Sequence, residues 1–362
     1  MKKLVFTVTN ELNFDQRMQR ICGTLQDNGY DVLLIGRENK KSPQLSPQIF
    51  KQKRLHCFFN KGFLFYGEYN IRLFFYLMSI RTDVYCAIDL DTILPVYFVS
   101  IFKNTKRVYD AHEYFTEQKE IVTRPLVHRV WLTIEKFAVP RFPKGYTVNQ
   151  SLSHFFYQKY KVEYKVVRNL PKFYALEKVE KEDYIIYQGA LNEGRGFETL
   201  IPAMQYVNKP LRIYGKGNFE TKAKYIVKNL GLENKVFFMG NIAPEALNEA
   251  TIKAFAGIMI VENTGLSLYY SLANKFFDYM MAEIPQICIG YPEYRTINDQ
   301  YNFAYLIDNI EINTLTNSLN KLSNNIELYK ELKENCSNSK KELNWEKEST
   351  ILIDFYKNMD SK

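Results

Sequence analysis

Short apolar runs alternate along the chain with stretches in which apolar residues recur every three or four positions. The first run, residues 4–8, is followed by a helical pattern over residues 15–27, and Gly29 then precedes a second run at residues 31–36. Runs of this length predict buried strands, and the three- and four-residue spacing predicts amphipathic helices. A strand, a helix and a second strand in this order predict a parallel β-α-β unit.

The same alternation continues through both halves of the chain. In the first half, further strands are expected at residues 84–88, 106–109, 145–148 and 164–167, with a helix at 92–102. A charged linker over residues 172–183 precedes a second series of strands at 184–187, 211–214, 236–239, 256–261 and 286–289. A chain of 362 residues is too long for one ordinary core, so we expect two successive doubly wound α/β domains. A closing amphipathic helix at 345–359 is expected to pack back across the domain junction.

Cysteine content and hydropathy narrow the class of protein. The five cysteines are odd in number and lack the spacing of metal ligands, which fits a reducing compartment without disulfides. No apolar run approaches the roughly 20 residues of a membrane-spanning helix, and the first residues lack the apolar core of a signal peptide. We therefore expect a soluble, cytoplasmic protein.

Positive charge is concentrated in the first half. Residues 1–172 contain 27 Lys and Arg against 15 Asp and Glu, whereas the remaining residues contain 21 against 25. This excess predicts an anionic partner, such as a bilayer surface or a phosphorylated acceptor, although ordinary solvated charge has the same signature. No nucleic-acid recognition motif is present, so no nucleic-acid partner is expected. Residues 59–81 and 124–142 mix basic and aromatic side chains, which is typical of a surface resting on anionic headgroups and equally of helices with basic outer faces.

The stretch from Ser271 to Cys288 carries the most specific pattern. It predicts a short amphipathic helix and an apolar strand, with Asn274 and Lys275 at the helix start and Asp278 one turn later on the same face. A helix start offers backbone N–H groups and a positive dipole end to phosphate. A carboxylate one turn later can accept two hydrogen bonds from the neighbouring hydroxyls of a ribose. The pattern therefore indicates a nucleotide site, although an ordinary surface helix with a polar start has the same spacing.

Other candidate residues of the second half follow predicted strands, at the carboxyl ends where open α/β sheets bind ligands. Gly189 allows the backbone to approach a ligand closely, and Arg195 at the next helix start suits a bidentate phosphate contact. Gly215 and Gly217 end another strand. They lack the third glycine of the dinucleotide fingerprint and are therefore only a weak indication of NAD.

In the first half, Asp110, His112 and Glu113 come directly after a predicted strand. A histidine beside two carboxylates can bind an anion or exchange a proton, and a purely structural histidine is the alternative. Asp89 and Asp91 superficially resemble a metal-binding Asp-x-Asp pair. Helix N-capping accounts for at least one of them, so no metal site is expected.

Taken in order, several segments resemble the retaining glycosyltransferases of family 4, which have the two-domain GT-B fold. The segments are DQRMQRI with NGYDV, DLDTIL, YDAHE, VVRNLP, YQGALNEGRGFETLI, GNIAPEAL, LANKFFDYMMAEIPQI, and NWEKES with DFY, and they span nearly the whole chain. The resemblance implies two Rossmann-like domains facing a cleft: an acceptor-binding domain over residues 1–172 and a nucleotide-sugar-binding domain over residues 173–343. A C-terminal helical segment, 344–362, would return to the first domain.

The resemblance also implies roles for individual residues. Catalytic roles fall on His112, which would face the donor sugar, and on Glu113, Arg195 and Lys275. Nucleotide-sugar-binding roles fall on Gly189, Gly215, Gly217, Gly240, Glu262, Tyr270, Leu272, Ala273, Asn274 and Asp278. No cofactor or metal is implied, because the nucleotide-sugar is itself a substrate. Stabilising the departing diphosphate would be the main catalytic task.

Three positions depart from the family pattern and leave the donor's identity open. Ala190 stands where many relatives carry a basic residue, Tyr270 where many carry a glutamate, and Glu283 where glycine is usual. Glu262 is the expected substitute for the glutamate absent at Tyr270. We expect transfer of a sugar from a UDP- or GDP-sugar to a glycan or lipid-linked acceptor in surface polysaccharide assembly, at the inner face of the plasma membrane. The alternatives are a nucleotide-sugar epimerase on the same fold and a non-catalytic glycan-assembly scaffold.

Overall fold

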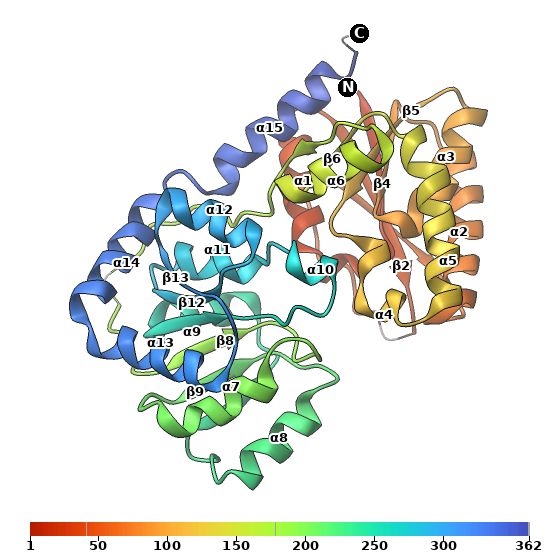
Figure 1. Ribbon diagram of the computed structural model, residues 1–362. Helices are drawn as coiled ribbons and strands as arrows, with labels where there is room; N and C mark the ends of the chain where they lie inside the picture. The colour runs from red at the N-terminus through yellow and green to blue at the C-terminus, as the bar shows by residue number, and fades with distance from the viewer. Residues whose placement is uncertain (41, 178, 361–362) are drawn as a thin grey trace. The chain divides into compact units, whose positions relative to one another are not determined.

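The apolar runs become two parallel sheets, one in each half of the chain (Figure 1). The computed structural model describes residues 1–40, 42–177 and 179–360. Position 178 of the expected linker and positions 361–362 of the expected C-terminal segment lie outside the described residues. The chain separates into unit 1, residues 1–169 with 348–362, and unit 2, residues 170–347.

Within the described residues, unit 1 contains a 7-stranded sheet in the order β3-β2-β1-β4-β5-β6-β7. Its strands are β1 (Lys3–Thr7), β2 (Asp31–Glu38), β3 (Lys51–His56), β4 (Val84–Ile88), β5 (Lys106–Ala111), β6 (Gly145–Thr147) and β7 (Lys165–Val166). Its helices are α1 (Gln16–Asp27), α2 (Gly62–Ser79), α3 (Ile93–Phe102), α4 (Lys119–Val122), α5 (Pro125–Ala138) and α6 (Gln150–Tyr160), with a short 3₁₀ turn η2 (Leu90–Thr92). Helices α2, α3 and α5 cover one face of the sheet, and α1 and α6 cover the other (Figure 1).

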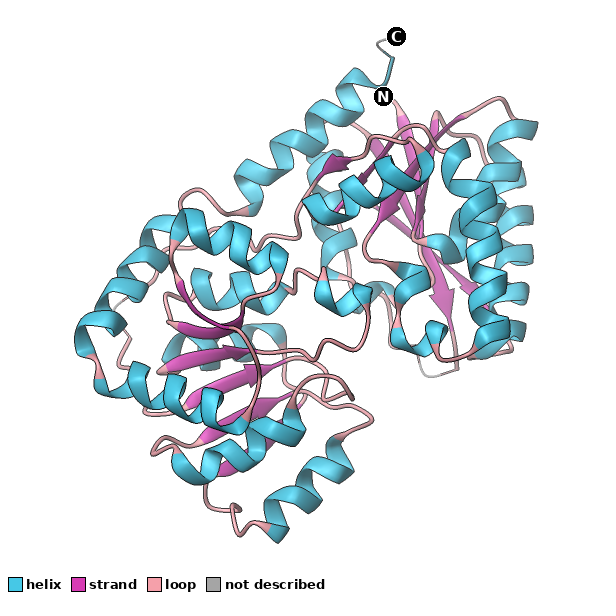
Figure 2. Ribbon diagram, in the orientation of Figure 1, coloured by secondary structure: helices cyan, strands magenta, loops and turns pink. Residues whose placement is uncertain are grey.

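Unit 2 repeats this architecture with a 6-stranded sheet in the order β10-β9-β8-β11-β12-β13, again within the described residues. Its strands are β8 (Ile185–Gln188), β9 (Leu211–Tyr214), β10 (Val236–Gly240), β11 (Ala256–Met259), β12 (Gln286–Ile289) and β13 (Ala304–Ile307). Its helices are α7 (Phe197–Ala203), α8 (Glu220–Asn229), α9 (Pro244–Lys253), α10 (Leu266–Tyr269), α11 (Asn274–Met281), α12 (Pro292–Tyr301), α13 (Ile312–Asn324) and α14 (Ile326–Ser339). Each sheet is flanked by helices, as the magenta strands and cyan helices of Figure 2 show.

Helix α1 illustrates how the sequence sets these elements. The side chain of Asp15 accepts a hydrogen bond from the backbone N–H of Met18 at 3.0 Å and caps the helix start. Met18, Ile21 and Leu25 recur at three- and four-residue spacing and are fully buried. Gly29, with φ of 83°, reverses the chain after the helix end. The polar and apolar pattern therefore fixes both the ends and the buried face of the helix.

The last helix, α15 (Trp345–Lys357), joins unit 1 although it follows unit 2 in the chain. The Tyr356 ring lies 6.0 Å from that of Phe6 in β1 and 6.2 Å from that of Tyr30. The Glu348 side chain also accepts the backbone N–H of Arg168 at 2.6 Å. The predicted return of this helix to the first domain is therefore confirmed.

The strand orders are those of doubly wound Rossmann-like sheets, in which connections run in opposite directions on either side of one strand pair. That pair is β1 and β4 in unit 1, and β8 and β11 in unit 2. The predicted α/β class with two such sheets is confirmed. In open sheets of this kind, ligands bind beyond the carboxyl ends of the strands at this position.

Candidate functional site

The carboxyl ends of β8, β9 and β10 form a tight glycine-lined surface in unit 2. Gly189 follows β8, Gly215 and Gly217 follow β9, and Gly240 ends β10. The backbone N–H of Gly215 donates to the carbonyl oxygen of Gly240 at 2.8 Å. A Cβ added to Gly215, whose φ is 135°, would lie 2.0 Å from the carbonyl oxygen of Gly189. Only glycine fits there, and it allows the two strand ends to approach each other closely.

Two cations meet beside this surface. Lys275 lies in the first turn of α11, its side chain is 8% exposed, and its ammonium lies 3.7 Å from the ring centroid of Tyr187. Burial, together with the positive charge of Arg195, holds the pKa of Lys275 well below its usual range. Among the described residues, neither side chain has a hydrogen bond or ion pair to an acid. Two neighbouring cations without an acid partner reduce the stability of the folded protein, and an anion that binds between them would remove this cost.

Asp278 is held one turn further along α11 by two buried polar side chains. Gln188 at the end of β8 donates from Nε2 to Asp278 Oδ2 at 2.9 Å. Thr251 of α9 in turn donates from Oγ1 to Gln188 Oε1 at 2.7 Å. The carboxylate is therefore fixed on the same helix as Lys275 and Asn274. The sequence analysis assigned no role to Gln188 or Thr251, which orient Asp278 in this candidate site. The available signal was the polar residue that ends the otherwise apolar strand IIYQ.

The segment before α11 is fixed by Tyr294. Its hydroxyl accepts the backbone N–H of Ala273 at 2.9 Å and lies 3.2 Å from Ser271 Oγ. Ala273 is the N-cap residue of α11 and provides no capping side chain, and Leu272 packs against the core of unit 2. The N-cap residue therefore contributes no side-chain hydrogen bond to the helix start, and backbone N–H groups at a helix start favour an anion.

Glu262 and Tyr270 lie in the connection that follows β11. The backbone N–H of Glu262 donates to the carbonyl oxygen of Gly194 at 2.9 Å, which joins it to the loop that carries Arg195. Tyr270 ends α10, and its ring lies 4.9 Å from that of Tyr269. The structure therefore brings Glu262 into direct contact with the Arg195 loop.

In unit 1, His112 lies between two carboxylates. Its Nε2 is 3.0 Å from Asp110 Oδ2, and its Nδ1 is 3.6 Å from Asp89 Oδ2. Asp110 is fully buried and accepts a second bond from Arg17 Nη2 at 3.0 Å. Burial lowers the pKa of His112, but the two carboxylates outweigh it and raise that pKa to about 9. The ring is therefore positive at neutral pH, which favours a charge-stabilising over a proton-accepting role.

The expected N-capping by Asp89 or Asp91 is wrong. Asp89 Oδ1 accepts the backbone N–H of His112 at 2.8 Å, and Asp91 Oδ2 accepts the hydroxyl of Thr9. Asp89 makes no side-chain cap to η2, and the N-cap residue of α3 is Thr92. Strand order explains the difference, because the adjacent ends of β1, β4 and β5 supply closer partners for both carboxylates than a helix start does. No group of three or more His, Cys, Asp or Glu among the described residues has metal-site geometry.

These acidic groups line one end of a cavity of about 1040 Å³ that lies entirely within unit 1. Asp89, Asp91, His112 and the exposed Glu113 form its polar end, and the helices α2, α4 and α5 form the rest. Burial raises the pKa of Asp91 to about 7 and that of Asp89 to about 8. Asp89 and Asp91 at the polar end therefore titrate near neutral pH.

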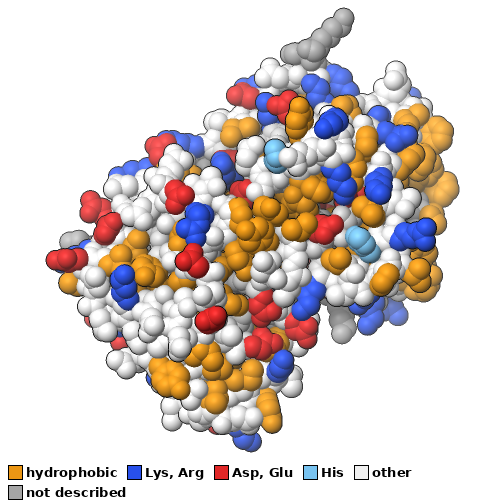
Figure 3. All heavy atoms as spheres, viewed as in Figure 1, with side chains coloured by type: hydrophobic (Ala, Val, Ile, Leu, Met, Phe, Trp, Pro, Cys, Tyr) orange, Lys and Arg blue, Asp and Glu red, His pale blue; other side chains and the backbone are white. Residues whose placement is uncertain are grey.

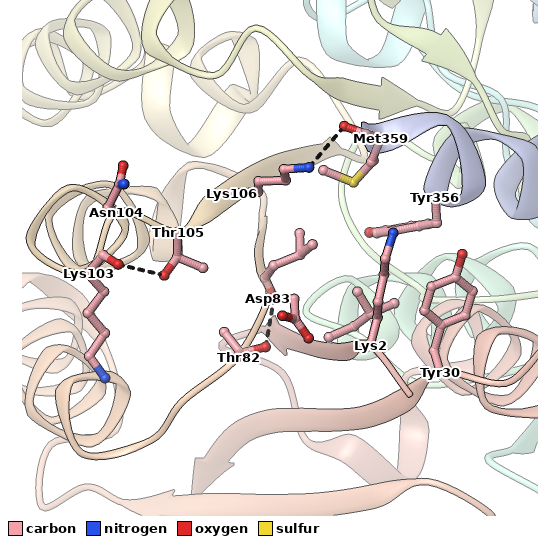
Figure 4. A pocket seen from close by; sticks show the side chains of 12 residues that line it. Lys2, Tyr30, Thr82, Asp83, Lys103, Asn104, Thr105, Lys106, Tyr356 and Met359 are labelled. Carbon is pink, nitrogen blue, oxygen red and sulfur yellow. Dashed lines mark hydrogen bonds between the residues drawn. The ribbon is translucent and has the colours of Figure 1, made fainter. Parts of the chain in front are cut away.

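A smaller cavity of about 420 Å³ lies at the opposite, amino ends of the same strands (Figure 4). Three of its lining residues are lysines, but Lys103 donates to the carbonyl oxygen of Leu77 at 2.9 Å and Lys106 to that of Met359 at 3.4 Å. These bonds fix the ends of α2 and of the C-terminal segment. We therefore assign this cavity a structural role.

The family match falls on unit 2. Residues 171–339 match the family described as Glycosyl transferases group 1. Nearly all of unit 2 is therefore similar to this family, and Lys275, Asp278 and Arg195 all lie in the matched region. None of the curated proteins is significantly similar to the sequence.

Solved structures share the fold of the whole chain. Sucrose-phosphate synthase from Thermosynechococcus elongatus is 14% identical, with a TM-score of 0.78 over 99% of each chain. HepE of Anabaena, in complex with UDP-glucose, is 12% identical, with a TM-score of 0.77 over 99% of this chain and 100% of that one. WaaG, a glycosyltransferase involved in lipopolysaccharide biosynthesis, is 13% identical, with a TM-score of 0.76 over 99% of this chain and 100% of that one. The shared fold is GT-B.

The region that matches the family accordingly contains most of the residues singled out from the sequence. Lys275, Arg195 and Asp278 lie around the strand ends that carry Gly189 and Gly215, within one unit. His112 and Glu113 lie in unit 1 and contact the cavity described above. None of the described helices is both long and apolar enough to cross a bilayer, and all five cysteines are buried and unpaired.

Proposed function

We propose that the protein is a retaining glycosyltransferase that moves a hexose-type sugar from a UDP- or GDP-sugar to a glycan or lipid-linked acceptor in surface polysaccharide assembly. The observation that carries the proposal is the meeting of Lys275 and Arg195, without an acid partner among the described residues, beside an oriented Asp278. The group 1 domain match covers the same residues, and the HepE structures contain UDP or UDP-glucose.

In the proposed reaction, the nucleotide diphosphate binds Lys275, Arg195 and the start of α11, and Asp278 accepts the ribose hydroxyls. The bond from the anomeric carbon to the diphosphate oxygen breaks while the acceptor oxygen bonds to the same face of the sugar. The acceptor hydroxyl proton leaves with the diphosphate. Two cations and a helix dipole, already in place, stabilise the charge that develops on the leaving group.

The remaining proposals concern unit 1. His112 and Glu113 keep their implied catalytic roles, and the acceptor binds this unit. No cofactor or metal takes part. We also propose that the protein associates with the cytoplasmic face of an anionic membrane, and the excess of Lys and Arg in the first half of the chain supports this.

Nucleotide binding tests the proposal. A nucleotide or nucleotide-sugar at 100 times its dissociation constant stabilises a protein by about 2.7 kcal/mol, so UDP, GDP or their glucose and mannose conjugates should raise the melting temperature. Lys275→Met should weaken that binding roughly ten- to hundredfold, because it removes one charged hydrogen bond of about 1.5–3 kcal/mol. The same change removes an unpaired buried charge, so the ligand-free protein should melt no lower than before.

Lys224→Met is the matched control. Lys224 is an exposed lysine of the same unit, paired with Glu220 on α8, and should not affect nucleotide affinity. If no nucleotide moves the melting temperature, or if both lysine variants behave alike, the diphosphate site is refuted.

Slow release of free sugar from the bound donor distinguishes an enzyme from a non-catalytic scaffold. Formation of an epimer of the donor without acceptor would identify an epimerase.

A further inference from the structure

The cavity of unit 1 is larger and more apolar than a sugar alone requires. Its volume of about 1040 Å³ lies at the upper end of the range for small-molecule sites, roughly 300–1,000 Å³. Of the four carboxylates among the described lining residues, Asp89, Asp91 and Glu113 lie on the strand-end loops, and Glu120 lies on α4. We propose that this cavity binds an acceptor whose sugar is joined to an apolar chain, with the sugar at the carboxylate end and the chain along α5. That this ligand is the acceptor rests on the proposed function, whereas the binding of a sugar with an apolar chain does not.

The polar end suits hydroxyl groups. Asp91, Glu113 and Asn10 line it from three successive strand-end loops of the sheet. Carboxylates accept hydrogen bonds from neighbouring hydroxyls, and an amide both donates and accepts, which matches the groups that a sugar presents.

The other end is an uncovered apolar helix face. Val127, Val130, Trp131 and Ile134 follow one another at helical spacing along α5 and all line the cavity. Trp131 is fixed by Tyr66, with ring centroids 5.2 Å apart, and by Phe115, with centroids 4.8 Å apart. The fold leaves Val127 39% and Val130 45% exposed in this position. An apolar chain would cover this face without needing a hydrogen-bond partner, whereas a long oligosaccharide would leave its hydroxyls unpaired there.

Gly67 provides an independent indication that this space is kept open. It lies within α2, where glycine costs roughly 0.5–1 kcal/mol relative to alanine, and it lines the cavity. A Cβ built on Gly67 meets no atom within 4 Å, so packing does not require glycine there. Its helical backbone does not require glycine either, because its φ is not positive. Any larger side chain at this position would occupy the cavity itself.

Alkyl glycosides test the inference directly. We expect calorimetric titration of the full-length protein with methyl, butyl, hexyl and octyl β-D-glucopyranoside, below their micelle concentrations and without donor, to show affinity rising with chain length. Each buried methylene should lower the dissociation constant about fourfold. Galactoside and mannoside series test whether the head group changes affinity at constant chain length.

Two variants, Gly67→Leu and Val130→Asp, test whether the alkyl chain of the ligand binds along α2 and α5. Gly67→Leu should abolish the dependence on chain length, whereas Gly67→Ala should weaken it much less, because alanine fills little of the cavity. Val130→Asp should have the same effect as Gly67→Leu. Ile101→Asp is the matched control: Ile101 is similarly exposed, at 49%, but lies on α3 outside the cavity lining.

Several outcomes would overturn the inference: no alkyl glycoside binds, affinity is independent of chain length, or Ile101→Asp removes the dependence while Gly67→Leu preserves it. The last result would indicate adsorption to the exposed face of α2 and α3. Chain-length-independent binding together with normal nucleotide binding would refute the inference alone. Chain-length-dependent binding without any nucleotide binding would refute the proposed function alone.

Discussion

Glu283 shows how a single departure from the family pattern is accommodated. It stands where glycine is usual in the resembling family and adopts φ of 50°, a conformation that costs a residue with a Cβ roughly 1–2 kcal/mol. Its carboxylate lies 2.7 Å from the ammonium of Lys340, whose side chain is 5% exposed. Removing one partner of a buried ion pair costs about 3–5 kcal/mol. The ion pair therefore outweighs the backbone strain.

Glu283→Gly is expected to destabilise unit 2 by about 2 kcal/mol, because the loss of the ion pair exceeds the relief of strain. That corresponds to a fall of roughly 4–8 °C in its melting temperature, measured by calorimetry. The double variant Glu283→Gly with Lys340→Met should recover most of the loss, since no buried charge is then left unpaired. A single variant that melts higher than the parent would contradict this account.

At the scale of elements, most strands were predictable from apolar runs, including the short strands β6 and β7, whereas β3 and β13 were not. Strand β3, with the sequence KQKRLH, lies at the sheet edge and has one buried residue, so it lacks an apolar run. Strand β13 is only four residues long and half-buried at two of them. Both are defined by pairing with β2 and β12, which no local pattern reveals.

The site residues also divide into those whose proximity the sequence predicted and those whose proximity it did not. Lys275 and Asp278 share one helix, so their helical spacing predicted that they lie together. The Arg17–Asp110 pair joins α1 to β5 across 93 positions of sequence, and Gln188 meets Asp278 across 90. Such contacts follow from strand order and from burial, which composition and spacing do not encode. The cavity of unit 1 likewise needs α2 and α5, which are distant in sequence.

Strand order also brings titratable groups together at the ends of β1, β4 and β5. The stability of the fold should therefore depend on pH. Burial raises the pKa of Asp91 from 3.8 to about 7, and its partner Thr9 only partly opposes this. Folding therefore favours its protonated form, so stability falls as pH rises between about 4 and 7. For His112, the stabilisation is complete below about pH 6.5 and is lost as pH rises through about 9.

Both contributions have the same sign, so the melting temperature of unit 1 should fall from pH 5 to pH 9. Asp91→Asn should make this fall shallower, mainly below pH 7, because the amide does not titrate. Thermal scans at intervals of one pH unit measure the slope. Asp27→Asn, at an exposed position of α1, is the control and should leave the slope unchanged. An identical slope in Asp91→Asn and the parent would refute the assignment.

At the scale of the whole molecule, charge and exposed apolar surface coincide in unit 1. Large apolar side chains of α2 and α3 are exposed, among them Phe75 and Phe102. In Figure 3, an orange area lies at the right edge, where Figure 1 shows these two helices. Phe102 contacts Phe74 with ring centroids 6.2 Å apart, which places the two helices in one surface. Exposed Lys61 and Arg81 flank α2. Aromatic side chains with a basic border match the interface of an anionic bilayer.

We expect the protein to sediment with vesicles containing phosphatidylglycerol and not with purely zwitterionic vesicles. Each Lys or Arg near such a surface contributes about 1 kcal/mol, so binding should weaken as salt is raised. Phe102→Glu should reduce binding severalfold, because it removes an inserting ring and adds repulsion from the anionic lipid. Tyr206→Glu, at a similarly exposed position of unit 2, is the control and should bind as the parent does. If binding persists in Phe102→Glu or is independent of anionic lipid, the exposed face of α2 and α3 does not contact the membrane. The positive charge of unit 1 would then serve the acceptor alone.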